Sequence, residues 1–488
     1  MNPAPHQPHI QPPFMHVDPS HRASQAAMGA LVGSAVGDAL GAPFEFEGPG
    51  LYGDNFPQAV LGGTGEMIGG GAFNWGVGEF TDDTQMAMAL AESLVAVGDF
   101  DPERTFEHFR AWSRSAVDIG NTTRVALGES DYRTAASRAH DLIRRTGSNG
   151  AVMRVAPVGV MGVARGSEWA RRVAFAQGTL THFDPIASWC AAVVAEFIRR
   201  IAVDGFGPGS FTGLTDFVEE PYRSQINQAI EVTDEPMSGS NGGALVCTAH
   251  AFWAFHHGNS FAEVVQRAIN LGGDTDTVAA VAGAIAGARF GIQGIPSRWT
   301  TYLNGEVTQP DGSVKYYRYR DLQDLTHLLM GRSLRGETTP EPIIEPKMVH
   351  DLGVWATNLI GAQASDTSMA LVSMCRNYGR MDHHPVRREV FMIDEDARNA
   401  NLAHALWDAV DSIDAFLAEG RQVIVHCHGG RSRTGLVLKA WYMKRFGVSH
   451  REAIDWIISV WGDHYAEWTD DFLMLLDDYE LRTNSSNT

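Results

Sequence analysis

Hydrophobic residues recur at helical spacing through most of the first 330 positions, whereas the alternation typical of strands is scarce there. The clearest stretches, rich in Ala and Gly, are residues 26–40, 84–98, 186–203, 243–258 and 277–291. Their small residues allow helices to approach closely. The pattern therefore predicts a compact all-α domain of about 300 residues.

The pattern changes after residue 347. The short β-branched runs 390–393 and 422–427 each precede a helical segment, at 402–420 and 433–447. Alternation of strand, loop and helix predicts a parallel sheet in an α/β domain. We therefore expect a multidomain chain with a disordered leader at 1–21, an all-α domain at 22–330, a linker at 331–347 rich in turn residues, and an α/β domain at 348–488.

Charge and cysteine usage narrow the function. The chain has 488 residues with 58 acidic and 38 basic side chains, a net charge of −20. That balance disfavours nucleic acid and anionic membranes as partners, although a local positive pocket remains compatible with it. The four cysteines are far apart and no apolar run reaches the ~20 residues of a membrane span, so we expect a cytoplasmic protein.

Two acidic clusters precede predicted helices in the first domain, Thr81-Asp82-Asp83-Thr84 and Asp274-Thr275-Asp276-Thr277. Helix capping explains one such cluster. It explains two less well, because each cluster crowds two carboxylates that repel each other unless a cation is present. Four carboxylates balance two divalent ions, and ligands that are all oxygen favour Mg²⁺ or Mn²⁺ over Zn²⁺. The two clusters are therefore expected to meet across a shared pair of ions.

Several separated motifs together resemble the ADP-ribosylglycohydrolase family, which includes the dinitrogenase reductase-activating glycohydrolases. They are GDALGAPFE, FTDDTQMA, GSNGAVMRVAPVG, THFDP and NLGGDTDTVAAVAGAIAGARFG, in the order of the family. The resemblance covers about residues 22–330. It implies an all-α fold, two Mg²⁺ or Mn²⁺ ions, and hydrolysis of the N- or O-glycosidic bond at the distal ribose of ADP-ribose.

The resemblance also implies roles for single residues. Metal ligands would be Thr81, Asp82 and Asp83 on one side and Asp274, Asp276 and Thr277 on the other. Glu45 would act as a base or a mobile gate, and Ser148, Asn149 and Gly150 would contact the diphosphate and adenosine. His182 has two interpretations, a substrate-side histidine or a satisfied core histidine.

A second candidate site follows the apolar run 422–427, in the segment Cys427-His428-Gly429-Gly430-Arg431-Ser432-Arg433-Thr434-Gly435. A thiol at a strand end, before a helix N-terminus and an arginine, is favoured as a nucleophile. Five intervening residues let backbone N–H groups surround a phosphoryl group, and Gly429 and Gly430 permit the required dihedral angles. Arg433 can clamp the phosphoryl oxygens, and Thr434 is placed to hydrogen-bond the sulfur.

This arrangement resembles the cysteine-dependent dual-specificity protein phosphatases over about residues 348–480. The resemblance implies a phosphocysteine intermediate and an acid loop that protonates the leaving oxygen. Asp396, five residues before Asn401, is the preferred acid, with Asp394 and Glu395 as alternatives. Arg431 and His428 would line the rim of the loop and aid anionic substrates.

The leading hypothesis is a bifunctional hydrolase with both activities. Its expected partners are an ADP-ribosylated protein or a small molecule containing ADP-ribose, and a phosphorylated protein or a small phosphomonoester. One alternative is sequential processing of an ADP-ribose phosphate metabolite by the two sites. In another, one domain only binds ADP-ribose or phosphate.

Overall fold

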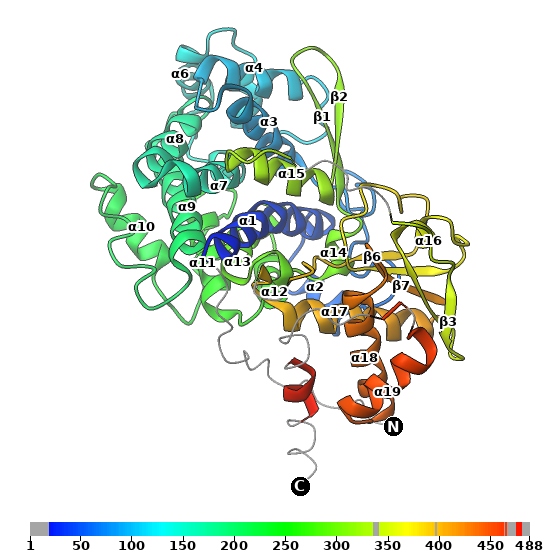
Figure 1. Ribbon diagram of the computed structural model, residues 1–488. Coiled ribbons are helices and arrows are strands. Elements are labelled where there is room, and N and C mark those ends of the chain that lie inside the picture. The colour runs from blue at the N-terminus through cyan, green and yellow to red at the C-terminus, as the bar shows by residue number, and fades with distance from the viewer. Residues whose placement is uncertain (1–18, 335–340, 396–397, 463, 466–474, 481–488) are drawn as a thin grey trace.

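A helical domain packs against a smaller α/β domain in the computed structural model (Figure 1). The structure describes residues 19–334, 341–395, 398–462, 464–465 and 475–480. Most of the predicted leader and part of the predicted linker lie outside these ranges. The predicted fold class, an all-α domain followed by an α/β domain, is confirmed.

The helices of the first domain account for all five predicted stretches. Its α-helices are α1 (Pro19–Gly41), α2 (Leu51–Asn55), α3 (Asp82–Val97), α4 (Pro102–Trp112), α5 (Asn121–Leu127), α6 (Tyr132–Ile143), α7 (Ala156–Arg165), α8 (Ser167–Thr179), α9 (Pro185–Asp204), α10 (Tyr222–Ile230), α11 (Ala244–His257), α12 (Phe261–Ile269), α13 (Thr275–Phe290), α14 (Ser297–Thr300) and α15 (Tyr319–Leu329). An antiparallel hairpin of β1 (Asn304–Thr308) and β2 (Val314–Arg318) was not predicted. Most residues of β2 are exposed, so the hairpin lacks a clear alternation of hydrophobic and polar positions.

The centre of this domain is the antiparallel pair α1 and α13. Glycines on α1 recur every fourth residue, and a Cβ added at Gly29, Gly33 or Gly37 would lie 1.9–2.4 Å from a backbone oxygen of α13. Only glycine permits this separation, so the predicted close approach is confirmed. The segment Ser20–Phe44 is apolar and long enough to cross a membrane, but 94% of its most apolar window is buried inside the protein, as in a core helix.

The second domain is built on a five-stranded sheet in the order β3-β4-β7-β5-β6. The strands are β3 (Lys347–His350), β4 (Val354–Asn358), β5 (Ala370–Ser373), β6 (Arg387–Glu389) and β7 (Val423–Cys427). Strands β4, β7, β5 and β6 are parallel, and β3 is antiparallel to β4. Residues of α17 (Leu402–Ala418) and α18 (Ser432–Phe446) pack on one face of this sheet, and those of α16 (Leu359–Gln363) pack on the other.

One predicted strand is wrong. Residues 390–393 form no strand, and β6 ends one residue earlier, at Glu389. The apolar side chains Val390 and Met392 are instead buried in one core with α17 and α18, and the Val390 N–H still donates to Ser373 O of β5 at 2.9 Å. The run at 423–427 and both following helices are confirmed as β7, α17 and α18.

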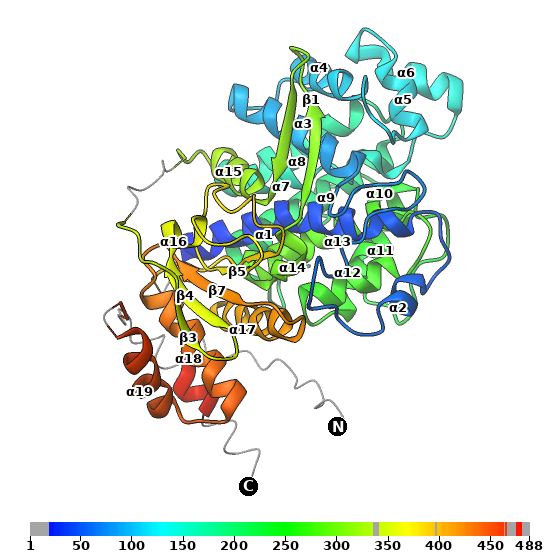
Figure 2. The ribbon, with the colours of Figure 1, turned by 90° about the vertical axis from the view of Figure 1, so that its right-hand side faces the viewer.

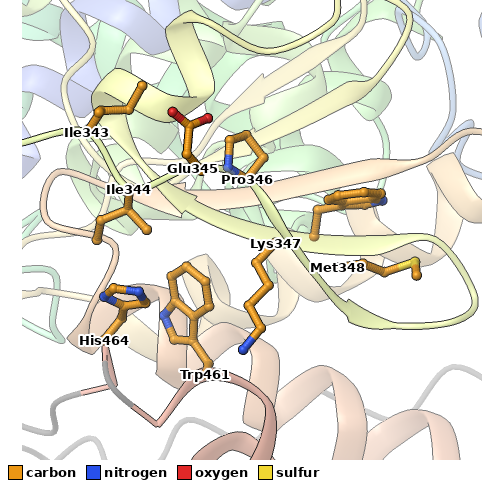
Figure 3. A pocket seen from close by; sticks show the side chains of 9 residues that line it. Ile343, Ile344, Glu345, Pro346, Lys347, Met348, Trp461 and His464 are labelled. Carbon is orange, nitrogen blue, oxygen red and sulfur yellow. The ribbon is translucent and has the colours of Figure 1, made fainter.

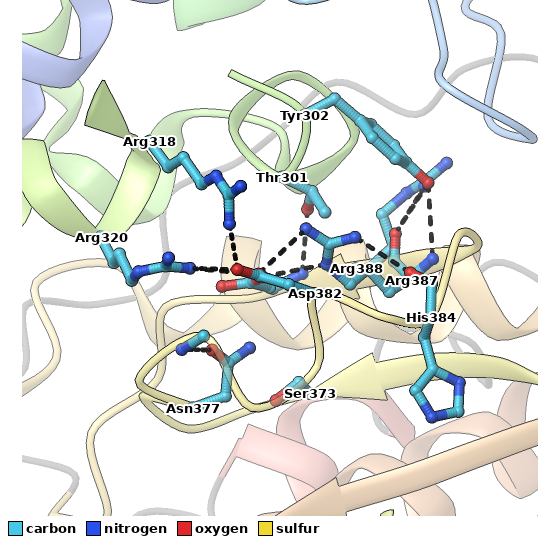
Figure 4. A network of polar contacts seen from close by, with 12 residues as sticks. Thr301, Tyr302, Arg318, Arg320, Ser373, Asn377, Asp382, His384, Arg387 and Arg388 are labelled. Atoms are coloured by element: carbon cyan, nitrogen blue, oxygen red, sulfur yellow. Dashed lines mark hydrogen bonds and ion pairs between the residues drawn. The ribbon is translucent and has the colours of Figure 1, made fainter. Parts of the chain in front are cut away.

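The two domains share an extensive polar interface (Figure 4). Asp382 forms ion pairs with Arg318, Arg320 and Arg387, two of which belong to the helical domain. Arg388 is fully buried and donates to the backbone oxygens of Gly63 and Leu61. Figure 2 shows α1 running across the helical domain to the edge where the α/β domain packs.

Candidate active sites

The predicted acidic clusters lie at the N-termini of α3 and α13. Thr81 is the N-cap of α3, and its hydroxyl accepts a hydrogen bond from the Asp83 backbone at 3.4 Å. Asp274 is the N-cap of α13 and follows two glycines with positive φ, Gly272 at 73° and Gly273 at 75°. A side chain on Gly272 would meet the backbone of Glu47 and Pro49 at 2.9 Å or less, so this turn requires glycine.

The fold brings the two clusters together. Carboxylate oxygens lie within 4.8 Å of one another in three groups, which are Asp38-Asp83-Asp276, Glu45-Asp274-Asp276 and Asp82-Asp118-Asp276. Asp276 belongs to all three and is fully buried. Thr81 Oγ1 lies 3.4 Å from Asp276 Oδ2, and Thr277 Oγ1 lies 3.3 Å from Asp83 Oδ2, so both threonine hydroxyls also face the cluster.

Asp38, near the end of α1, joins these elements. It accepts hydrogen bonds from the backbone of Thr81 at 3.0 Å and of Thr84 at 3.0 Å, and from the Thr84 hydroxyl at 2.5 Å. These bonds satisfy free N–H groups at the start of α3. Asp38 therefore positions the first acidic motif as well as adding its own charge.

The charge of this cluster is not balanced by ion pairs among the described residues. None of its seven carboxylates forms an ion pair with a lysine or arginine in the part of the chain that the structure describes. Asp83 Oδ1 and Glu45 Oε2 are buried without hydrogen-bond partners among the described atoms. Burial and the neighbouring carboxylates raise the pKa of Asp82, Asp83 and Asp276 well above the ordinary value. Hard oxygen donors with unpartnered buried atoms are the arrangement that divalent cations stabilise, so the residues fit a metal centre.

Two acids of the cluster come from loops. Glu45 is 8% exposed, and burial followed by the charges of Asp118, Asp274 and Asp38 raises its pKa to about 8. Its loop is held by hydrogen bonds between Phe46 N and Gly273 O at 2.7 Å and between Gly273 N and Glu47 O at 3.0 Å.

Asp118 was missed by the sequence analysis. It lies between α4 and α5, and burial and Asp274 raise its pKa to about 6. No motif or helical pattern surrounds this residue, so only the fold reveals its position beside Asp82.

The segment 148–150 lies next to the same cluster. Asn149 Nδ2 donates to Asp274 Oδ2 at 2.9 Å, which connects the segment directly to the acids. A hydrogen bond of 2.9 Å joins Ser148 Oγ to His182 Nε2, and a Cβ on Gly150 would lie 3.1 Å from the same ring. His182 is 1% exposed, and its other nitrogen bonds to Thr181 at 2.8 Å. Both ring nitrogens of His182 are therefore hydrogen-bonded within the protein, one of them to Ser148 of the predicted substrate segment.

The phosphate-loop motif connects β7 to α18. Cys427 ends β7 and is 1% exposed, and α18 begins at Ser432. Gly430 has φ of 68°, and a Cβ there would lie 2.7 Å from Thr357 O, so this position requires glycine. Trp461 of α19 (His450–Trp461) donates to Gly430 O at 2.9 Å and supports the loop from behind.

Arg433 links this loop to the segment expected to carry the acid. Its Nη1 donates to Met374 O at 2.8 Å and to Met392 O at 2.9 Å. Burial opposes its charge, but Cys427, Cys375 and Asp394 together raise the pKa of Arg433. Asp394 accepts a hydrogen bond from Ser432 Oγ and lies 3.5 Å from Arg433 Nε. Of the three candidate acids, Asp394 and Glu395 are described, whereas Asp396 lies outside the described residues.

Three predicted residues of the loop have different environments. The Thr434 hydroxyl is buried and has no hydrogen-bond partner among the described residues, so the predicted bond to sulfur is absent from this structure. Arg431 is half exposed at the rim and lies 3.7 Å from Glu341. The Glu341 carboxylate also lies against Gly429, 2.9 Å from where a Cβ would be.

A cavity of about 610 Å³ lies between the segment 343–348, which includes the start of β3, and the end of α19 (Figure 3). It is lined by Ile343, Ile344, Pro346, Trp355 and Trp461 together with a few polar side chains. Neither Cys427 nor Arg433 lines it, so it is separate from the thiol.

Comparison with known proteins identifies a family for each of the two domains. The family model of ADP-ribosylglycohydrolase matches residues 19–338, and that of the dual specificity phosphatase catalytic domain matches residues 362–466. The chain is 31% identical over 283 residues to the ADP-ribosyl-[dinitrogen reductase] glycohydrolase of Rhodospirillum rubrum, covering 58% of this chain and 91% of that protein.

Two further relatives agree. The ADP-ribosylarginine hydrolase Tri1 of Serratia proteamaculans is 32% identical over 303 residues, covering 58% of this chain and 77% of Tri1. A solved ADP-ribosylglycohydrolase-related protein complex superposes with a TM-score of 0.50 at 30% identity, covering 64% of this chain and 99% of that one. The chain therefore belongs to the ADP-ribosylglycohydrolase family and carries, after that domain, a dual specificity phosphatase catalytic domain, so both of its parts belong to families of hydrolases.

Proposed function

We propose that the chain is a bifunctional hydrolase. Its first site removes ADP-ribose from a modified acceptor with the help of two Mg²⁺ ions, with Mn²⁺ as the alternative. Its second site hydrolyses phosphomonoesters through Cys427. The observation that carries the first activity is the clustering of seven carboxylates, with Asp276 in all three groups. The second activity depends on the positions of Cys427 at the end of β7 and Arg433 in the first turn of α18.

In the first site, the proposed ligands are Thr81, Asp82 and Asp83 from the start of α3, and Asp274, Asp276 and Thr277 from the start of α13. The ions, when bound, would hold the ribose hydroxyls and stabilise negative charge near the glycosidic bond. Asn149 fixes the Asp274 carboxylate through its 2.9 Å hydrogen bond. Glu45 is the proposed proton acceptor or gate, since its carboxyl lies within the cluster while its loop borders the exposed Phe46.

For the acceptor we propose arginine. The support is the relative named as an ADP-ribosylarginine hydrolase, which shares 32% identity with this chain. The test is release of ADP-ribose from ADP-ribosylarginine and from ADP-ribosylserine, compared at equal concentration. Faster release from the serine conjugate would contradict this assignment.

In the second site, the Cys427 thiolate attacks phosphorus, and the bond from phosphorus to the ester oxygen breaks. The leaving oxygen takes a proton from an acid on the loop after β6, for which Asp396 and Asp394 are the candidates. Water then attacks the phosphocysteine, which releases phosphate and restores the thiol. Arg433 is held by Met374 O and Met392 O, so its remaining nitrogens can face the transferred group.

The test is to purify Cys427→Ser and Asp82→Ala separately and to measure both reactions for each. We expect the first variant to lose only phosphatase activity and the second to lose only glycohydrolase activity. If neither change affects either reaction, the proposal is wrong. Calorimetric titration of Asp274→Asn with Mg²⁺ adds a direct readout, because undiminished tight binding would contradict the ligand assignment.

A further inference from the structure

Two glutamines of the helical domain hold the loop of the phosphatase domain that carries the candidate acids. Gln25 lies near the start of α1, and Gln293 lies in a 3-10 turn at Ile292–Gly294, directly after α13. The side chains are 2% and 3% exposed. Buried amides of this kind are retained when their donors and acceptors are matched.

Gln293 uses both ends of its amide on the loop. Its Nε2 donates to Asn399 Oδ1 at 2.8 Å and to Phe391 O at 3.2 Å, and its Oε1 accepts from Asn401 N at 2.7 Å. Along the chain these partners come before and after the described acids Asp394 and Glu395. One side chain therefore fixes the entry and the exit of the loop.

Gln25 contacts the same loop from α1. Its Oε1 accepts from Ala400 N at 3.0 Å, and its Nε2 donates to Arg398 O. Its backbone lies 3.9 Å from the position of a Cβ on Gly291, so the two glutamines extend from adjacent positions of the packed pair α1 and α13.

Asn399 connects Gln293 to the backbone on both sides of Asp394. Its Nδ2 donates to Ile393 O at 3.0 Å and to Glu395 O at 2.9 Å, and its Oδ1 accepts from Ile393 N at 2.9 Å. Asp394, next to Ile393, contacts Ser432 and Arg433 of the phosphate loop. Hydrogen bonds thus run from Gln293 through Asn399 to Ile393, the residue before Asp394, and Gln25 holds the residues on either side of Asn399.

We infer that Gln293 and Gln25 are positioning residues of the phosphatase, so that the helical domain completes the phosphatase site by fixing its acid loop. The inference rests on the proposed phosphatase function. Proton transfer requires the acid within hydrogen-bond reach of the leaving oxygen, and a loop released from its anchors loses that geometry. Cys427 keeps its place at the end of β7, and Arg433 keeps its hydrogen bond to Met374 O outside the loop, so phosphate binding is expected to persist.

The test uses the full chain with Gln293→Ala, Gln25→Ala and Gln293→Met, which keeps most of the side-chain volume but removes the amide donors and acceptor. Each variant is assayed on 4-nitrophenyl phosphate, whose leaving group needs little protonation, and on phenyl phosphate, whose leaving group needs much more. The matched control is Glu419→Ala. Glu419 accepts from Gly63 N at 2.7 Å across the same domain interface but bonds to no described residue of the acid loop.

For Gln293→Ala we expect kcat on phenyl phosphate to fall at least ~10-fold, a fraction of what a general acid contributes. On 4-nitrophenyl phosphate the fall should stay below about threefold, with KM unchanged for both substrates. In a chain whose residues 394–396 are all converted to amides, Gln293→Ala should add no further loss, because residues that act as a unit are not additive.

Equal losses on both substrates, or the same selective loss in Glu419→Ala, would overturn the inference, since either result means general loosening of the interface. Should Gln293→Ala fail to fold, shown by lost glycohydrolase activity, Gln293→Met and Gln25→Ala decide the outcome. The proposed function is judged separately. If the unmodified chain does not hydrolyse either phosphate ester, the phosphatase assignment itself fails. If the chain is active and the glutamine variants hydrolyse both esters at the same rates, only the role of the glutamines is refuted.

Discussion

The two sites of this protein are built in opposite ways. The phosphate loop takes its nucleophile, glycines and arginine from one continuous stretch, residues 427–433, between a strand and a helix. The acidic cluster joins carboxylates from the ends of α1, α3 and α13 and from two loops, which are separated by up to about 240 residues along the chain. A local site depends mainly on its own turn, whereas an assembled site depends on every helix contact that brings its parts together.

The largest expected effect tests the local site, which is the phosphate loop. Arg433→Lys should lower phosphatase kcat/KM on the order of 10³-fold, because an ammonium cannot replace the planar fork that bonds Met374 O, Met392 O and phosphate together. Glycohydrolase activity should be unchanged. Steady-state kinetics of both reactions on one preparation checks this, and a loss of less than about tenfold would show that Arg433 does not clamp the phosphoryl group.

The next largest effect tests the assembled site, which is the acidic cluster. Asp276→Asn should lower glycohydrolase activity at least ~100-fold, because its carboxylate belongs to all three acidic groups. Bound metal, measured by elemental analysis after dialysis against Mg²⁺ or Mn²⁺, should fall with it, while phosphatase kinetics stay constant. The opposite result, full metal content with normal activity, would break the assignment of Asp276 as the shared ligand.

A third substitution tests whether the acidic cluster depends more strongly than the phosphate loop on the packing of α1 against α13. Gly37→Ala would place a Cβ 1.9 Å from Ala279 O and push α1 away from α13, at a cost of about 1–3 kcal/mol in the free energy of unfolding. Glycohydrolase activity should fall before phosphatase activity, because Asp38 and the start of α13 move. The matched control is Gly209→Ala, where a Cβ meets nothing within 4 Å. Equal loss of both activities would show that the local site depends on this packing just as strongly.

The smallest effect is on thermal stability. Glu45 and Asp118 have pKa values raised to about 8 and about 6, chiefly by burial, so without metal the folded state binds their protons more tightly than the unfolded state does. This contribution to stability is present at low pH and is lost as pH rises through those values. The gain in Tm on replacing EDTA by Mg²⁺ should therefore grow by a few degrees between about pH 5 and pH 8. A gain that is constant over this range would count against a metal centre formed by these acids.

The same contrast explains what the sequence could predict. Helix spacing located the five long helices, and the loop after β7 was recognised from its residues alone. The wrong strand at 390–393 shows the weakness of a short apolar run, which is buried against helices as readily as in a sheet. Asp118 and the two anchoring glutamines could not be found, because ordinary polar residues without a motif acquire a role only when distant segments meet.

The glycine-lined pairing of α1 with α13 also has a consequence for biosynthesis. Gly33 of α1 meets Gly283, so the first helix leaves the ribosome about 250 residues before its partner is made. At about 5–20 residues per second that interval is on the order of 12–50 s. For that time the nascent chain presents a segment as apolar as a membrane span, from Ser20 to Phe44. Production of this enzyme should therefore depend on a chaperone that shields its N-terminal helix until translation reaches the other half of the pair.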